Sequence, residues 1–398
     1  MNAPPPMRGR PALPGTQRGM SLIDVLVGMV IGLIGMIVVF QSFNAFESQK
    51  RTTMTATDAQ ESGLMALTTI EREMRLVGYG MYYGNRAICA SMRQWANSGI
   101  ETIPNVLPIA ITNGASNASD AVTLTYSTSA FGATPAMIQV NFDGSTPAVI
   151  VDNAVGNSAF RMGDHILIGT PSVPTRPCVR LQVSSVISDP TAPQRVSLQL
   201  ESGTTAPANP PAAQLRTLVP TGGYSNNPDP ALASVVTNMA AMRRVTYGVV
   251  LDSSYNGRLQ AQDITGGTAA VDVADGIVNM QAQYGISTTA QTMEVSSWVD
   301  ATGTWAAPGE ADAGRIKAVR IAVVARSQLL EKEAVTGVGV TCSNTSGDNA
   351  NGPCAWRDTT ANPAPVIDLS ANTNWQRYRY RVYETIVPLR NVMWQTFQ

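Results

Sequence analysis

The sequence predicts an α+β protein, in which a long N-terminal helix packs on a large antiparallel, β-rich head. Three observations predict this class. An uncharged apolar run extends from Val25 to Phe46, an amphipathic stripe follows it as far as Val77, and short β-branched runs separated by turn residues fill the rest of the chain. With 398 residues, 44% of them hydrophobic, the chain can bury a large core.

The composition limits the kinds of partner. Charged residues make up 14% of the chain and the formal net charge is −1. Such a chain is too hydrophobic to be disordered, and its polar surface must come largely from Thr, Ser, Asn and Gln. Because the chain is not basic, we expect no broad phosphate-binding surface and no nucleic-acid partner.

Residues 1–19 are predicted to be an unstructured leader. The only charges in the leader are Arg8, Arg10 and Arg18. Positive residues next to a membrane span favour the cytoplasmic side, although Lys50 and Arg51 follow the span and weaken this bias. We therefore expect a cytoplasmic N-terminus.

Residues 20–46 are predicted to be the transmembrane part of the helix. Val25 to Phe46 is a run of 22 uncharged residues, and about 20 helical residues cross a bilayer core. Thirteen of them are Leu, Ile, Val or Phe, which outweigh the roughly 3 kcal/mol cost of Asp24. A carboxylate inside a membrane is costly enough to indicate a function, and the alternative is that Asp24 lies at headgroup level.

Small residues interrupt this apolar segment. Gly28 and Gly32 form a GxxxG pattern, and Gly35 follows one turn later. The pattern permits close packing of helices, but glycine is common in membrane helices and could equally let the helix loosen as subunits pack.

Residues 47–80 are predicted to be an amphipathic part of the same helix. Its apolar stripe is Leu67, Ile70, Met74 and Val77. Gly78 and Gly80 supply a stop signal. A helix from Met20 to Val77 would be about 87 Å long, far more than a bilayer, so its outer half must pack on another surface, and the candidate is the protein's own β-rich head.

Residues 81–398 are predicted to form the β-rich head. The candidate strands are Ala121–Tyr126, Met137–Phe142, His165–Ile168, Val179–Ile187, Arg195–Leu200, Arg243–Leu251, Ile277–Tyr284, Ile316–Ala325 and Arg377–Pro388. Six prolines with several glycines and asparagines between Thr204 and Pro230 indicate a long surface excursion or a sub-domain boundary at residues 204–230.

The four cysteines point to disulfides. Cys89, Cys178, Cys342 and Cys354 contain no CxxC pair, and the chain has one histidine, so a zinc site is not expected. Beyond a membrane span the compartment is oxidising, and an even number of cysteines favours disulfides over free buried thiols. Of three connectivities, Cys342–Cys354 closes the shortest loop, which would leave Cys89–Cys178 as the second pair.

No arrangement of residues predicts catalysis. His165 has no nucleophile signature near it and is expected to be structural, and Asp164 beside it is expected to form a turn. The charged run Glu71, Arg72, Glu73 and Arg75 is interpreted as a solvated helix face with i,i+4 pairs.

Metal and sugar sites are not predicted either. The run Gly347–Gly352 lacks the first acidic ligand of an EF-hand loop. The tryptophans interpreted as core or loop anchors, not as a sugar platform, are Trp298, Trp305, Trp356, Trp375 and Trp394. We expect no enzyme activity, no cofactor and no metal.

The N-terminal residues resemble a type IV prepilin. Gly19 is followed by Met20-Ser21-Leu22-Ile23, and an acid, Asp24, stands at the fifth position. The resemblance implies cleavage after Gly19 by a membrane peptidase and methylation of the new N-terminus, Met20. The usual residue at the fifth position is Glu, and it is thought to meet the N-terminal amine of a neighbouring subunit. Asp24 is one methylene shorter.

Further stretches resemble the PilW-type minor pilins. They are Glu61–Gly80, Gly276–Ile286, Ile316–Ser327 and Tyr378–Asn391. This resemblance implies a pilin-like spine and a role in type IV pilus assembly, in a tip or priming complex with other minor pilins. The implied partners are a prepilin peptidase, the major pilin or a tip adhesin.

The resemblance also implies a location. The precursor would cross the inner membrane once with its head in the periplasm, and the mature protein would lie in the pilus or at its tip. Two alternatives remain. One is a pseudopilin of the type II secretion system, and the other, from a different class, is a membrane-anchored periplasmic enzyme or ligand-binding protein, which would need a polar pocket with converging ionisable groups.

Overall fold

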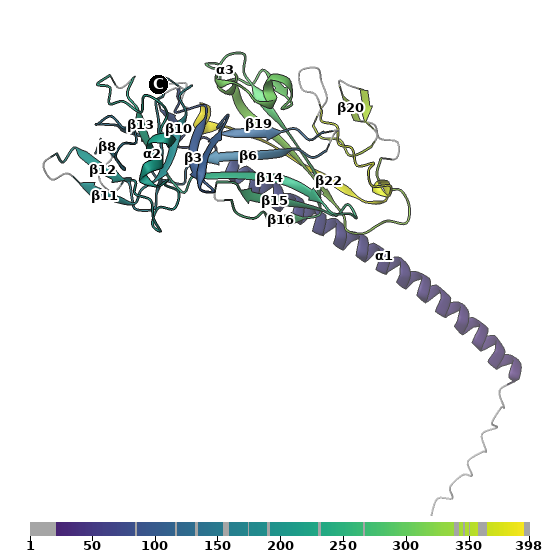
Figure 1. Ribbon diagram of the computed structural model, residues 1–398. Coiled ribbons are helices and arrows are strands. Elements are labelled where there is room, and N and C mark those ends of the chain that lie inside the picture. Colours follow the sequence, from purple (N-terminus) through teal and green to yellow (C-terminus); the bar gives the residue numbers. More distant parts are fainter. Residues whose placement is uncertain are drawn as a thin grey trace, which may run out of the picture. The chain divides into compact units, whose positions relative to one another are not determined.

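The computed structural model describes residues 21–83, 86–115, 118–131, 134–153, 159–173, 175–188, 192–229, 232–265, 267–337, 342–344, 347–349, 351–356 and 364–393 (Figure 1). The chain divides into an N-terminal unit, Met1–Met54, and a C-terminal unit, Thr55–Gln398. The α+β class is confirmed, since an N-terminal apolar helix precedes a large β-rich region.

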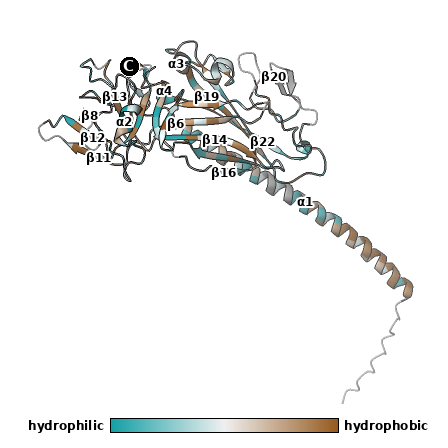
Figure 2. Cartoon of the chain, in the orientation of Figure 1, coloured by the Kyte–Doolittle hydropathy of each residue, from teal (hydrophilic) through white to brown (hydrophobic). Residues whose placement is uncertain are grey.

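Helix α1 (Leu22–Met74) is the longest element, at 53 residues. Ser21 caps its N-terminus, because the Ser21 Oγ accepts a hydrogen bond from the Ile23 amide at 3.3 Å. Figure 2 shows that the first half of α1 is mostly apolar and that the second half is mixed. Gly78 and Gly80 follow the helix with φ near +80°, a conformation that suits glycine, so the predicted stop is confirmed.

The other helices are short. They are α2 (Ala212–Leu218), α3 (Glu310–Ala313) and α4 (Arg390–Met393), with the 3-10 helices η3 (Gly303–Ala306) and η4 (Trp375–Arg377).

In the part of the chain that the structure describes, the strands form four larger sheets and two hairpins. The six-stranded sheet has the order β4 (Gly99–Ile103), β3 (Met92–Ala96), β10 (Cys178–Gln182), β9 (His165–Gly169), β13 (Val235–Ala240) and β7 (Ala136–Met137). The three-stranded sheet has the order β11 (Ser185–Ser188), β12 (Arg195–Gln199) and β8 (Ala148–Asp152).

The five-stranded sheet has the order β16 (Val271–Asp275), β15 (Gly257–Asp263), β14 (Arg243–Leu251), β6 (Ala121–Tyr126) and β5 (Ile109–Thr112). The four-stranded sheet has the order β18 (Ser297–Val299), β17 (Ile277–Ile286), β19 (Ile316–Arg326) and β22 (Tyr380–Pro388). The hairpins are β1 (Tyr82–Tyr83) with β2 (Arg86–Ala87), and β20 (Cys342–Asn344) with β21 (Gly347–Asn349).

The main core of the C-terminal unit lies between α1, the five-stranded sheet and the four-stranded sheet. Ile70 and Met74 of α1 join one cluster with Val122 of β6, Met280 of β17 and Val323 of β19. All residues of β17 and β19 are buried, because a second cluster around Ala322, Val324 and Ile367 covers the other face of the four-stranded sheet.

A separate core fills the part of the unit that holds the six-stranded and three-stranded sheets. It gathers apolar side chains from β8, β9, β10, β12 and α2. The pairings are antiparallel except for β3 and β10, which run parallel, with Met92 opposite Cys178. The sequence predicted an antiparallel head, and this parallel pair is the departure from it among the described pairings.

Three strand predictions need correction. The stretch Met137–Phe142 is a strand only at its first residue, as the end of β7. Val179–Ile187 is two strands, β10 and β11, which lie in different sheets. Residues 377–379 precede β22, and Arg377 ends η4. Sheet membership depends on distant partners, which a pattern within one segment does not show.

The proline-rich stretch at 204–230 also differs in part from the prediction. It contains α2, whose Leu215 and Leu218 are buried in the core of the six-stranded and three-stranded sheets. The prolines lie outside this helix, and Pro211 directly precedes its first residue, where the missing N–H costs no hydrogen bond.

Candidate assembly site

The N-terminal unit carries an apolar helical surface that is exposed among the described residues. Leu22–Glu47 is long and apolar enough to cross a membrane, and none of its apolar window is buried. Leu22 is 76% exposed and Phe46 is 71% exposed. Large apolar side chains left in water are unfavourable by about 1.5–3 kcal/mol each, so this surface requires a bilayer or partner helices.

Asp24 lies in the first turn of α1. The positive end of the helix dipole favours a carboxylate there. Among the residues that the structure describes, no side chain pairs with Asp24. Gly19 and Met20 lie outside the described residues, so cleavage, methylation and the pairing of Asp24 with a neighbour's amine stay predictions.

The glycines of the apolar segment have open surroundings. A methyl group added at Gly28, Gly32 or Gly35 would meet no atom within 4 Å. The described fold of the single chain therefore gives no steric reason for glycine at these positions. Their proposed role in helix packing stays a prediction that concerns other chains.

The second half of α1 is seated in the core of the C-terminal unit. The predicted stripe is confirmed, because Leu67, Ile70, Met74 and Val77 are all buried. At Gly63 the helix approaches strand β22 closely. A Cβ there would lie 2.2 Å from the Tyr383 ring of β22. The sequence alone does not distinguish Gly63, since a lone glycine in a helix is an ambiguous signal without the partner strand.

The charged run at the end of α1 is only partly the solvated face that the sequence predicted. Arg75 and Glu71 form the expected i,i+4 ion pair at 2.5 Å. Glu71 and Glu73 are both half-buried, and one carboxylate oxygen of Glu73 is buried without a hydrogen-bond partner. Burial, and then the Glu73 charge, raise the pKa of Tyr126 to about 12. Glu73 therefore belongs to the contact between α1 and the five-stranded sheet.

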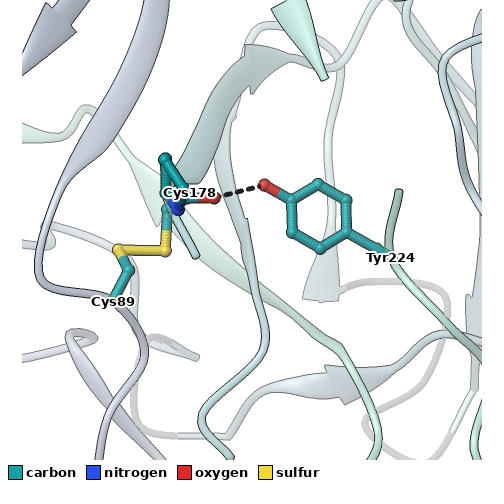
Figure 3. The surroundings of a disulfide bond; sticks show 4 residues. Cys89, Cys178 and Tyr224 are labelled. Carbon is teal, nitrogen blue, oxygen red and sulfur yellow. Dashed lines mark hydrogen bonds between the residues drawn. A yellow bond between two sulfur atoms is a disulfide. The ribbon is translucent and has the colours of Figure 1, made fainter. Parts of the chain in front are cut away.

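A disulfide ties the beginning of the head to β10. Cys89 and Cys178 are bonded, with their Cα atoms 5.6 Å apart and a sequence separation of 89 (Figure 3). The bond stands beside the parallel pair of β3 and β10. Tyr224 packs next to it, and its hydroxyl donates a hydrogen bond to the Pro177 carbonyl at 2.7 Å. The predicted Cys89–Cys178 pairing is thus present.

For the second predicted disulfide, Cys342–Cys354, the structure describes the state of one cysteine. Cys354 is disulfide-bonded. The Cys342 side chain lies outside the described residues, so the pairing of Cys342 with Cys354 stays a prediction.

Arg320 of β19 is a buried arginine that contacts two tryptophans and a glutamine. The Arg320 guanidinium carbon lies 4.9 Å from the ring centre of Trp298 and 4.2 Å from that of Trp356. Its Nε donates to Gln283 Oε1 at 2.8 Å, and Gln283 Nε2 donates to Asp300 at 2.6 Å. Burial lowers the pKa of Arg320 to about 10, against the opposing effect of the Asp300 charge. Trp298, in β18, and Trp356 both pack against this buried guanidinium, so each has a structural contact.

His165 and Asp164 lie in a partly buried region, where Asp164 forms hydrogen bonds within the fold. Burial, and next the charge of Arg180, lower the pKa of His165 to about 4, so it is neutral at pH 7. Asp164 forms the expected turn, since its Oδ2 accepts the Arg161 amide at 2.9 Å, and it also accepts Asn238 Nδ2 at 2.8 Å. In the described part of the chain, no group of His, Cys, Asp and Glu could hold a metal ion.

The fold defines a class of protein with an exposed apolar helix whose continuation is buried in a β-rich unit. Residues 246–391 match the family model of the type IV pilus-assembly protein W. This match extends from β14 to α4 and contains three of the four stretches that resembled PilW-type pilins, all but Glu61–Gly80. No curated protein and no solved structure matched the chain. The match supports a PilW-type pilus protein, and the apolar helix indicates membrane anchoring.

Proposed function

We propose that this chain is a minor pilin that acts in type IV pilus assembly, within a tip or priming complex of minor pilins. The observation that carries the proposal is the contrast along α1, which is exposed and apolar at its start and buried in the β-rich unit at its end. The match to a pilus-assembly family supports the minor-pilin hypothesis over the alternative of a type II secretion pseudopilin.

In this function the chain acts through binding and geometry. Its apolar helix would lie in the inner membrane with the N-terminus in the cytoplasm and the head in the periplasm, and it would pack among other pilin helices after assembly. A prepilin peptidase would remove the leader after Gly19 and methylate Met20. The partners would be other minor pilins, together with the major pilin or a tip adhesin.

Processing provides the first test. We expect the mature chain in membrane and filament fractions to begin at N-methyl-Met20, as measured by intact mass. Gly19→Leu should leave the precursor uncut in the membrane, because the peptidase must accommodate this residue at the cleaved bond. Gly15→Leu is the matched control, since it changes a glycine of the same leader away from the bond.

An intact leader on assembled protein would refute the processing step, as would normal cleavage of the Gly19→Leu variant. Loss of cleavage in the Gly15→Leu control would show that the leader as a whole, and not the residue at the bond, is recognised.

Asp24 provides a second test. Residues four positions apart in a helix lie about 6 Å apart along its axis, so a neighbour's N-terminal amine could meet the Asp24 carboxylate and set the subunit register. Asp24→Asn should leave insertion and cleavage intact but reduce co-purification of partner pilins by about tenfold or more, because one member of a desolvated ion pair is lost. Asp24→Glu should be tolerated.

The measurement is the amount of partner pilin recovered with each tagged variant at equal expression. Recruitment by Asp24→Asn at the parent level would show that Asp24 is a headgroup-level residue without a role in register.

A further inference from the structure

The C-terminal unit contains a cavity of about 480 Å³ that the assembly role does not use. It lies between the end of β14, the start of β17, the end of β19 and the loop at 368–372. Its apolar walls are Val249, Leu251, Val278, Leu369 and the rings of Tyr255 and Tyr380. Cavities of this size and character hold small ligands or the ends of chains.

Arg326, the last residue of β19, lines this cavity although its exposed fraction is only 5%. Its guanidinium lies over the Tyr378 ring at 4.2 Å. Nη2 donates one hydrogen bond, to Asn256 Oδ1 at 2.7 Å. Among the described residues, no carboxylate pairs with Arg326 and no other acceptor takes its remaining N–H groups. A guanidinium has five N–H donors, so most of the binding capacity of this buried cation is unused.

The rest of the lining selects among anions. Asp368 is the acidic residue of the cavity, and Ser370 donates to its Oδ1 from both the amide and the hydroxyl. Burial raises the pKa of Asp368, but these hydrogen bonds outweigh burial and hold the pKa below its usual range. One cation and one carboxylate give a lining without net charge, which disfavours a phosphate dianion. A single carboxylate matches the fork of the guanidinium.

We propose that this cavity binds a carboxylate carried on an apolar group, with the carboxylate on Arg326 and the apolar group against Val249, Val278 and Leu369. Such a ligand could be a small organic acid or the C-terminal end of a polypeptide, since both present the same chemistry. The site does not rest on the assembly role, and its failure would leave the pilin proposal untouched.

The first experiment compares acids with their amides on the full-length chain in detergent micelles. The probes are N-acetyl-L-phenylalanine and the peptide Gly-Gly-Gly-Phe, each with a free carboxylate and as the amide, titrated by calorimetry. We expect the acids to bind at least about tenfold more tightly than the amides, because a hydrogen bond to a charged group is lost. Tighter binding of the peptide acid would identify a polypeptide end as the source, and equal binding would identify a small acid.

The second experiment assigns the binding to this cavity. Arg326→Gln should weaken acid binding by about tenfold to a hundredfold without changing amide binding. Ala118→Trp should block both acids, since Ala118 is exposed and lines the cavity. Ala269→Trp, at an exposed alanine that is not part of the lining, is the matched control and should bind as the parent does.

The Ala118→Trp variant keeps the test decisive if Arg326→Gln fails to fold. The proposal is overturned if neither acid binds, if acids and amides bind equally, or if blocking the cavity leaves acid binding unchanged.

Discussion

Replacing Cys89 and Cys178 together with alanine is expected to lower the free energy of unfolding of the C-terminal unit by about 4 kcal/mol. The bond closes a loop of 89 residues, and a cross-link of that span removes a large part of the entropy of the unfolded chain. Both sulfurs are also buried, in a cluster with Ile88, Met92 and Leu167, so their removal leaves a small cavity.

The measurement is denaturant unfolding followed by tryptophan fluorescence, which reports on the C-terminal unit because all six tryptophans follow residue 55. Removing Cys342 and Cys354 is the comparison. If those two residues are paired, their shorter loop should contribute only about 3 kcal/mol. Unfolding of the Cys89/Cys178 variant at the parent's denaturant concentration would contradict the expectation.

Gly63→Leu is expected to destabilise the C-terminal unit by about 3 kcal/mol. Even a Cβ at this position would stand 2.2 Å from Tyr383 and 3.2 Å from the Ala325 methyl, so a larger side chain forces α1 away from β19 and β22. Gly63→Ala should also destabilise. That sign is diagnostic, because alanine in an unhindered helix would stabilise by about 1 kcal/mol.

A double-mutant cycle tests the cause. Tyr383→Ala removes the ring that the new side chain would meet, so the double variant Gly63→Ala, Tyr383→Ala should be less destabilised than the sum of the single changes. Leu64→Ala is the control on the same helix, since Leu64 is 44% exposed, and it should change stability by about 0.5 kcal/mol or less. Additive effects in the cycle would show that Tyr383 does not limit the packing of Gly63.

Local patterns in the sequence were sufficient to predict the long helix and much of the sheet. The uncharged apolar run predicted the candidate span, and the spacing of Leu67, Ile70 and Met74 predicted the buried stripe. The strands Ala121–Tyr126 and Arg243–Leu251 were predicted with the bounds that they have. Each of these signals is a periodicity or a composition within one segment, which requires no knowledge of the partner.

Contacts between distant segments could not be predicted in this way. The division of Val179–Ile187 between two sheets and the parallel pairing of β3 with β10 depend on which strands meet. The same holds for the burial of Glu73, the need for glycine at position 63 and the guanidinium between Trp298 and Trp356.

The sequence by itself determined the α+β class, the apolar N-terminal helix with its acid at Asp24, the buried stripe of α1 and the resemblance to pilus-assembly proteins. Only the tertiary structure decided the strand order, the seat of α1 at Gly63 and the placing of Arg326 in a cavity. The physical reason is that a helix or strand signal arises from neighbours within a few residues along the chain. Packing and the burial of charge arise instead from contacts between residues that can be hundreds of positions apart in sequence. Those contacts form only when the whole chain has folded.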